Sequence, residues 1–355
     1  MRVPPGLVGI ALVFWLCGVE VPRAAEVRGK VALAHDSNLF EGAVDRRSGW
    51  VSRLHVSASG FLVRNARGQV VVDYQGGIKK LWQEPPGASG DGRGDVVINH
   101  AQARGEVRLT DRLAFAQLGM VKVKQVTRVP GEESYLRGAL EGRLSGRTHG
   151  GAAKGGFYLR WGGDDSRDAL LPEVTMREVG IDARFGRSRR LRASVRVSWR
   201  WLDYDRPALG SSRDGVALLE VEQSDLLRAA TVGLQLYRGT LANLTYGYLW
   251  NRSNSFGYGY SAHRLDLLLV RHLARGVDLQ VYLILQFRSY DDPVDPLPQA
   301  GADEYEQTMG VVKLSRQLTG RLGASLQYSF TRNGARRTGD FYRKHVTSLS
   351  LETSL

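Results

Sequence analysis

Residues 318–333 read LTGRLGASLQYSFTRN, and from Leu322 to Phe330 every second residue is apolar or aromatic. The positions between them hold side chains without a large apolar group, among them Gln327 and Ser329. Because successive side chains of a strand point to opposite faces, this pattern predicts a strand with one apolar and one polar face. Such a strand suits a sheet packed on a soluble core, and it equally suits a wall between lipid and water.

Length and composition allow one large domain or two ordinary ones in this 355-residue chain. Hydrophobic residues make up 43% of the chain and the formal net charge is +13. The basic residues are spread along the chain, usually in alternation with apolar ones, and they form no stripe of the kind that binds nucleic acid. We therefore expect no nucleic-acid partner.

The N-terminal segment has the features of a secretory signal peptide. Arg2 supplies a basic start, an apolar run extends from Leu7 to Val19, and Ala24 precedes Ala25 at a small-residue exit. We predict a signal peptide at residues 1–25 and a single barrel domain at residues 26–355. No later run approaches 18 consecutive apolar residues, so we expect no transmembrane helix.

The remainder of the chain consists of alternating segments rather than helical patterns. They predict an all-β protein with about 16 strands, within a range of about 14 to 18. The expected strands are residues 26–35, 50–64, 69–82, 95–110, 112–127, 132–145, 152–161, 173–186, 190–204, 222–238, 240–251, 258–274, 276–290, 304–318, 320–333 and 341–355.

Short and long connections alternate between these segments. NARG, TD, RG and TG are tight turns, whereas HDSNLFEGAVDRRSG, QEPPGASGDGRG and DDPVDPLPQAGAD are long and polar. Outer-membrane barrels have short periplasmic turns, long extracellular loops and an even number of strands. The rhythm predicts a transmembrane antiparallel up-and-down β-barrel. The longest connection, residues 205–223, is the one that we expect to fold inward as a constriction.

Aromatic residues gather near the strand ends that adjoin long connections. A membrane–water interface favours such rings, because they combine an apolar body with a polar tip. The predicted girdle comprises Trp50, Trp82, Trp161, Trp201, Tyr204, Trp250, Tyr290, Phe330 and Tyr342.

The polar faces of the strands predict the lining of a lumen. In residues 190–204, for example, Arg192, Arg196 and Arg200 alternate with apolar residues. The predicted basic lining is Arg104, Arg108, Lys122, Lys124, Arg137, Arg143, Arg160, Arg192, Arg196, Arg200 and Arg288. The predicted acidic lining is Glu106, Glu141, Glu178 and Asp182. The excess of basic groups predicts a preference for anionic solutes or an anionic polymer.

In these features the chain resembles Gram-negative outer-membrane β-barrel proteins. The segment AHDSNLFEG, from Ala34 to Gly42, resembles the D-S-N-aromatic segment that often ends the first strand of porin-like barrels, including barrels associated with exopolysaccharide export. Leu39 interrupts the match, and the chain ends on Leu355 where such barrels usually end on Phe or Trp. Asp36, Ser37 and Asn38 are also ordinary turn formers. The resemblance implies a location in the outer membrane, with lipid, lipopolysaccharide and the assembly machinery as partners and a periplasmic export protein as a further one.

The sequence shows no clear pattern of residues typical of an enzyme or of a metal site. Its seven histidines are scattered, and no HExxH or GxSxG motif occurs. His263 near Ser261 is the nearest approach to a rim enzyme, and ordinary girdle residues explain it better. We expect no enzyme activity, no metal site and no cofactor. The hypotheses that remain are a diffusion channel, the barrel of an exopolysaccharide export system, and a structural or adhesive barrel with a closed lumen.

Overall fold

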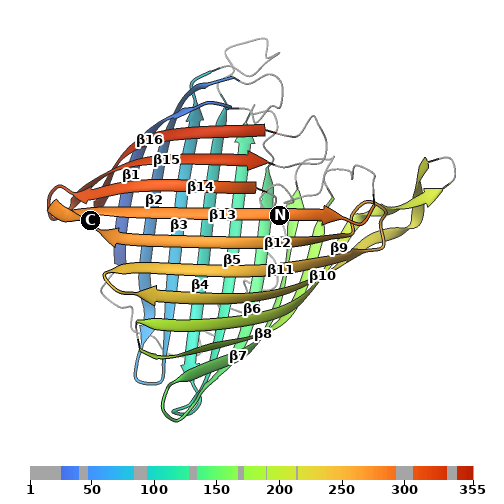
Figure 1. Ribbon diagram of the computed structural model, residues 1–355, viewed down its shortest axis with the longest axis horizontal. Helices are drawn as coiled ribbons and strands as arrows, with labels where there is room; N and C mark the ends of the chain where they lie inside the picture. The colour runs from blue at the N-terminus through green and yellow to red at the C-terminus, as the bar shows by residue number, and fades with distance from the viewer. Residues whose placement is uncertain are drawn as a thin grey trace.

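The computed structural model describes residues 25–39, 47–83, 94–127, 134–166, 172–188, 190–212, 215–292, 307–333 and 342–354. Its sixteen strands form one closed antiparallel barrel in which each strand pairs with its neighbours in the sequence and the last strand pairs with the first (Figure 1). The predicted fold class and strand number are confirmed, as is the architecture implied by the resemblance to Gram-negative outer-membrane barrels.

Most strand bounds agree with the alternating segments within a few residues. The strands are β1 (Ala25–Asp36), β2 (Gly49–Arg64), β3 (Gly68–Leu81), β4 (Asp95–Arg108), β5 (Leu113–Thr127), β6 (Tyr135–Arg147), β7 (Ala153–Ser166), β8 (Val174–Ser188), β9 (Leu191–Ser212), β10 (Gly215–Tyr237), β11 (Thr240–Ser253), β12 (Tyr260–His272), β13 (Val277–Tyr290), β14 (Gln307–Gln317), β15 (Leu322–Asn333) and β16 (Tyr342–Ser354). A single 3₁₀ turn, η1 (Ala274–Gly276), joins β12 to β13. No helix within the described residues has the length and apolar character needed to cross a membrane.

The outer face of the wall carries the large apolar side chains. Leu326 on β15 is 50% exposed, and Leu349 opposite it on β16 is 61% exposed. Gln327 and Ser329 alternate with the outward residues and therefore face the interior. Residues 322–333 thus form one strand of a wall that is apolar on the outside and polar on the inside.

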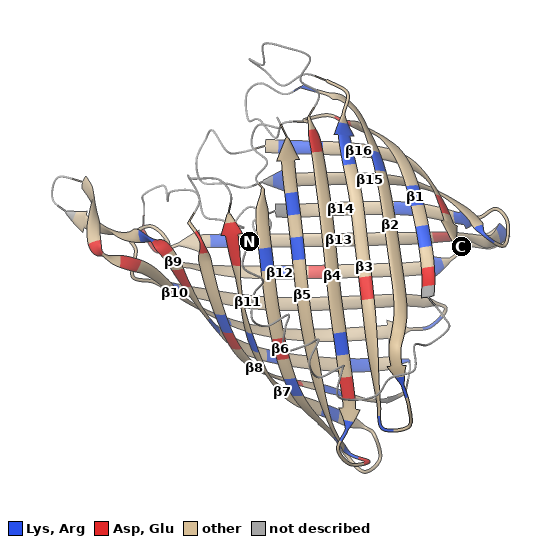
Figure 2. Cartoon of the chain, turned by 180° about the vertical axis from the view of Figure 1, so that it is seen from behind, with Lys and Arg blue, Asp and Glu red and all other residues tan. Residues whose placement is uncertain are grey.

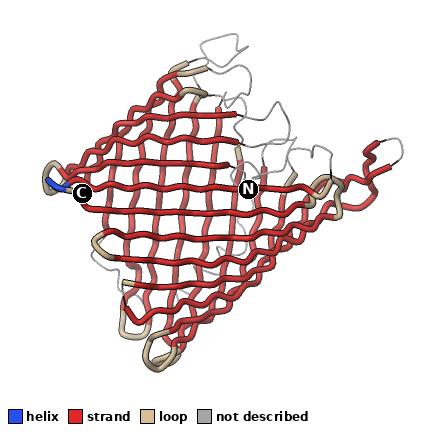
Figure 3. Tube along the Cα trace, viewed as in Figure 1, coloured by secondary structure: helices blue, strands red, loops and turns tan. Residues whose placement is uncertain are grey.

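Short connections gather at one end of the barrel, which we call the short-turn end. Several of them appear in tan in Figure 3. β10 turns into β11 through Arg238 and Gly239, and Gly239 adopts a positive φ of 73°. Glycine tolerates this left-handed conformation, which two-residue hairpin turns require. The opposite end, where β1 ends and β2 begins, is the long-connection end.

The connection predicted as an inward constriction is instead an extension of the sheet. β9 and β10 continue to pair from Asp203 and Ser224 to Ser212 and Gly215, and their hairpin projects beyond the neighbouring strands (Figure 1). Pro207 lies at a register irregularity opposite Glu222, where a missing N–H donor disturbs the ladder least. The prediction for residues 205–223 was wrong because proline and glycine masked the strand alternation of the VALLEVE segment.

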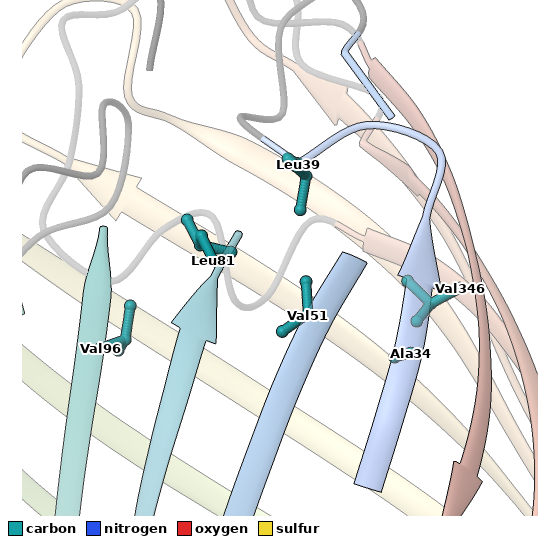
Figure 4. Close-up of a cluster of buried hydrophobic side chains, with 6 residues drawn as sticks. All are labelled: Ala34, Leu39, Val51, Leu81, Val96 and Val346. Atoms are coloured by element: carbon teal, nitrogen blue, oxygen red, sulfur yellow. The ribbon is translucent and has the colours of Figure 1, made fainter. Parts of the chain in front are cut away.

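The one apolar cluster among the described buried residues lies inside the barrel near the long-connection end. Side chains from β1 to β4, from β16 and from the segment after β1 meet there (Figure 4). The members are Ala34, Leu39, Val51, Leu81, Val96 and Val346. The cluster fastens Leu39 to the inner wall at the place where the first and last strands meet.

Candidate channel lumen

The register places the predicted lumen residues on the inward face of the wall. On β9, Arg200 alternates with Trp199 and Trp201, which are exposed on the outside. The same parity holds for Arg104, Arg108 and Glu106 on β4, Lys122 and Lys124 on β5, Arg137, Arg143 and Glu141 on β6, Arg160 on β7, Glu178 and Asp182 on β8, Arg192 and Arg196 on β9, and Arg288 on β13. Figure 2 shows Lys and Arg in blue, spaced along strands around the barrel.

Inward acids are engaged by neighbouring groups of the same wall. Arg143 lies 3.0 Å from Asp182 and 3.6 Å from Glu141, and Arg160 lies 3.7 Å from Glu141. The Arg160–Glu141 and Arg143–Asp182 pairs join β6 to β7 and β8, so they run along the wall. The negative charge of these acids is therefore compensated locally.

Glu178 is the most buried of the predicted lumen acids. The Arg200 guanidinium donates to Glu178 at 3.0 Å, and the Tyr158 hydroxyl donates to its other oxygen at 2.8 Å. Gly180 makes room for this arrangement, because a Cβ there would meet the Tyr158 ring at 2.4 Å. Glycine at this point of β8 thus allows tyrosine, carboxylate and arginine to share one site.

Several charged side chains that face inward were not predicted from the sequence. Asp164 accepts two hydrogen bonds from the Arg137 guanidinium, each of 2.7 Å, and Arg264 forms a 3.0 Å ion pair with Asp266. The further inward groups that the prediction omitted include Lys30, Arg53, Asp73, Lys79, Asp225, Lys313 and Lys344. Counting alternate positions from an exposed residue of the same strand would have identified these groups, since each alternates with outward residues of its own strand.

Arginine and tyrosine stack at the inner mouth of the long-connection end. The Arg288 guanidinium lies 4.0 Å from the centre of the Tyr260 ring. The Arg206 guanidinium lies 4.8 Å from the Tyr258 ring and 5.4 Å from the Tyr204 ring. Such cation–π contacts hold planar cations in fixed positions beside aromatic faces.

A second inward cluster surrounds one tyrosine. The Nζ atoms of Lys122 and Lys124 lie 5.3 and 5.8 Å from the centre of the Tyr135 ring, and the Arg137 guanidinium lies 5.3 Å from it. Three cations therefore meet on adjoining strands β5 and β6 near the long-connection end.

A cavity of about 420 Å³ follows the inner wall from β5 to β13. Its charged and aromatic lining includes Arg137, Arg160, Asp164, Arg200, Tyr204, Asp225, Tyr260, Arg264 and Arg288. Among these groups the guanidinium side chains outnumber the carboxylates, so the cavity presents a positive surface. Planar guanidinium groups bind carboxylate or phosphate oxygens with two parallel hydrogen bonds.

Six of the residues predicted for the aromatic girdle lie on the outer face. Trp50, Trp82, Trp161, Trp201 and Trp250 are exposed on the outer face, and Phe330 lies on the same face against His345.

Tyr204, Tyr290 and Tyr342 were assigned wrongly to that girdle. Tyr204 and Tyr342 are 5% and 4% exposed, and Tyr290 pairs with the partly buried Tyr260 on the inward face. Each stands an odd number of residues from an outward side chain of its strand, so alternation turns it inward. The distance of a residue from its strand end indicates how high its ring lies along the barrel wall, but it does not indicate whether the ring points outward or inward.

His263, the one histidine weighed for a rim enzyme, faces outward. Its Nδ1 lies 2.7 Å from the Tyr246 hydroxyl, and its ring lies 5.1 Å from that of Tyr248. Among the described residues no group of three or more His, Cys, Asp or Glu side chains is placed to hold a metal ion.

No protein-family model matches this chain, and neither does any curated protein. Among solved structures, a bacterial polysaccharide outer membrane secretin is similar over 95% of this chain and 100% of its own, with 9% identity and a TM-score of 0.46. OccAB3 from Acinetobacter baumannii is similar over 93% and 99%, with 9% identity and a TM-score of 0.47. A ferric enterobactin receptor (PfeA) from Pseudomonas aeruginosa is similar over 88% of this chain, with 12% identity and a TM-score of 0.40, and this chain spans about half, 54%, of its length.

Proposed function

We propose that this chain is an outer-membrane channel for anionic solutes or an anionic polymer. The observation that supports it is the charge balance of the inner wall. Acids such as Glu141, Asp164, Glu178 and Asp182 are paired with arginines of the wall, and further cations such as Arg192 and Arg196 share the inward face. A passage lined by one sign of charge concentrates ions of the opposite sign.

The outer wall supports a location in the membrane. Apolar side chains such as Leu33, Leu326 and Leu349 are half exposed or more on a barrel whose hydrogen-bond ladder is closed. Only a closed barrel or a helix satisfies its backbone within lipid, and this wall supplies the apolar outer surface that such a barrel needs. In this proposal the short-turn end faces the periplasm.

A closed lumen is less consistent with the ion pairs. Arg137–Asp164 and Arg200–Glu178 each join adjacent strands, and Arg143 reaches Asp182 across one intervening strand. Pairs of this kind stiffen the wall and fix the arginines in place. Pairs that sealed the lumen would join strands on opposite sides of the barrel.

Export of an acidic polysaccharide is the second candidate, and the inward tyrosines favour it. Tyr135, Tyr158 and Tyr260 lie beside arginine or lysine on the inner face. Aromatic faces can slide along sugar rings while the cations attract carboxylate groups, which is the combination that a passing polyuronate requires.

A liposome-swelling assay tests the proposal with sugars of one size and different charge. We expect galacturonate to enter proteoliposomes faster than glucose, and glucosamine to enter more slowly. Replacing Arg137, Arg160 and Arg200 with glutamine should remove the preference for galacturonate. Equal rates for all three sugars through the wild-type protein would refute the anion proposal, and no swelling at all would refute the channel.

A further inference from the structure

Arg177 lies on the outer face of the wall, between two tryptophans of the adjacent strands. The register pairs it with Trp161 on β7 and with Trp201 on β9. Its side chain is 62% exposed and forms an ion pair with Asp203. Arg177 stands three residues from the Val174 end of β8, which is the long-connection end.

Arg228 repeats this arrangement two strands away. The register pairs it with Trp199 on β9 and Trp250 on β11, and its guanidinium lies 4.7 Å from the centre of the Trp250 ring. Its Nε atom is buried and has no hydrogen-bond partner within the described part of the chain. A buried donor without a partner costs free energy, and an acceptor that reached this guanidinium would recover part of that cost.

The two arginines lie close together on either side of β9. Arg177 pairs with Trp201 and Arg228 pairs with Trp199, so the two positions are offset by two residues along β9. Two strand spacings of about 4.8 Å across the sheet and two residues of about 3.3 Å along it place the two Cα atoms roughly 12 Å apart. This is on the scale of a disaccharide with an anionic group at each end.

An apolar groove on the outer face adjoins Arg177. Its volume is about 630 Å³, and Phe115, Leu140, Leu159, Trp161, Val179 and Trp201 line it together with Arg177. Gly142 lies in the groove, and a Cβ at this glycine would touch only the Phe115 ring, at 3.9 Å. The wall is thus hollowed where a side chain is missing, and an acyl chain fits such a groove.

We propose that Arg177, Arg228 and the adjoining groove bind one phosphorylated glycolipid of the outer leaflet, of the lipopolysaccharide class. One phosphate binds each arginine, the sugar backbone lies against the tryptophan rings, and an acyl chain occupies the groove. The inference rests on the outer-membrane location proposed above, and it is independent of what passes through the lumen.

Asp203 is the ion-pair partner of Arg177 at this surface, and it competes with phosphate for that arginine. Replacing Asp203 with asparagine should therefore strengthen glycolipid binding by up to about fivefold, the range that an exposed ion pair allows. A purely structural role of the Arg177–Asp203 pair predicts no such gain.

Native mass spectrometry of the detergent-purified protein tests the proposal with bisphosphorylated lipid A as the probe. The double variant Arg177→Gln/Arg228→Gln should weaken binding by about tenfold for each arginine. The matched control is Arg271→Gln/Arg316→Gln, which removes two outward arginines at the short-turn end and should leave binding unchanged. Lipid A without its phosphates should bind the wild type as weakly as bisphosphorylated lipid A binds the double variant.

Gly142→Leu separates the groove from the charges, because it fills the groove and leaves both arginines in place. We expect it to weaken lipid A binding while the protein keeps its heat-modifiable gel mobility. The proposal is overturned if both arginine double variants bind lipid A equally well, or if dephosphorylated lipid A binds as tightly as the phosphorylated form. It is also overturned if Gly142→Leu abolishes a dimer without changing lipid A binding, since the groove would then be a contact between two copies.

Discussion

Asp36 and Lys344 join the first strand to the last, and breaking this pair should open the barrel at its seam. The Asp36 side chain is fully buried, the Lys344 side chain is 11% exposed, and the ammonium lies 3.1 Å from the carboxylate. The D-S-N segment adds backbone-directed bonds at the same place. The Asn38 N–H donates to Asp36 Oδ1 at 3.0 Å, and the His345 N–H donates to the Ser37 hydroxyl at 2.9 Å.

Asp36→Asn is the sharpest perturbation of this seam. Asparagine keeps a side-chain oxygen for the Asn38 N–H, so the turn survives while the negative charge is lost. Removing one partner of a buried ion pair costs about 3–5 kcal/mol. Because Lys344 retains some exposure, we expect a loss near the lower end, about 3 kcal/mol. Lys344→Met should cost a similar amount, whereas the double variant should recover much of the loss, because neither charge is then buried alone.

Urea titration of folding into dilauroylphosphatidylcholine vesicles, followed by tryptophan fluorescence, measures these free energies. Gel mobility without heating reports whether each variant still closes the barrel. A coupling free energy of at least about 1.5 kcal/mol between the two substitutions is expected from their direct contact. Additive effects, or single losses below about 1 kcal/mol, would refute the role given to this pair.

Two further predictions address the wall itself. Leu326→Arg places a charge on the lipid face and should cost about 2–4 kcal/mol in the same titration, whereas Gln327→Arg on the inward face should cost far less, and equal losses would contradict the assignment of faces. Gly162→Ala should destabilise the barrel by about 1–3 kcal/mol, because its Cβ would come within 2.4 Å of the Gly138 carbonyl oxygen. The control Gly138→Ala should be nearly neutral, because nothing lies within 4 Å of a Cβ at that position. Similar losses of stability for the two variants would refute this account of the close approach.

The architecture could be predicted from the sequence because each strand carries its own signal. Alternation of apolar and polar residues sets the faces, and the alternation of short and long connections sets the up-and-down order. The hairpin of β9 and β10 was missed because Pro207, Gly210 and Gly215 resemble loop residues, whereas the structure accommodates Pro207 at a register irregularity.

The lumen was predicted less completely than the fold. Parity along a strand identified inward groups such as Arg137 and Glu178, but their partners depend on the register between strands. Asp164, for example, lies 27 positions from Arg137 in the sequence and reaches it only through the pairing of β6 with β7. The D-S-N segment could be predicted to turn, but its bond from Asn38 to the Arg343 carbonyl spans 305 positions and exists only because the barrel closes.

The reversal potential of a single channel in a planar bilayer tests the central claim most directly. The proposed channel predicts an open conductance. With a tenfold gradient of potassium chloride, an inner wall whose acids are paired with arginines predicts a reversal potential of the sign set by chloride. Asp164→Asn should keep this sign, whereas the triple substitution of Arg137, Arg160 and Arg200 with glutamine should move the potential toward zero. A reversal potential of the sign set by potassium in the wild-type protein would contradict the account.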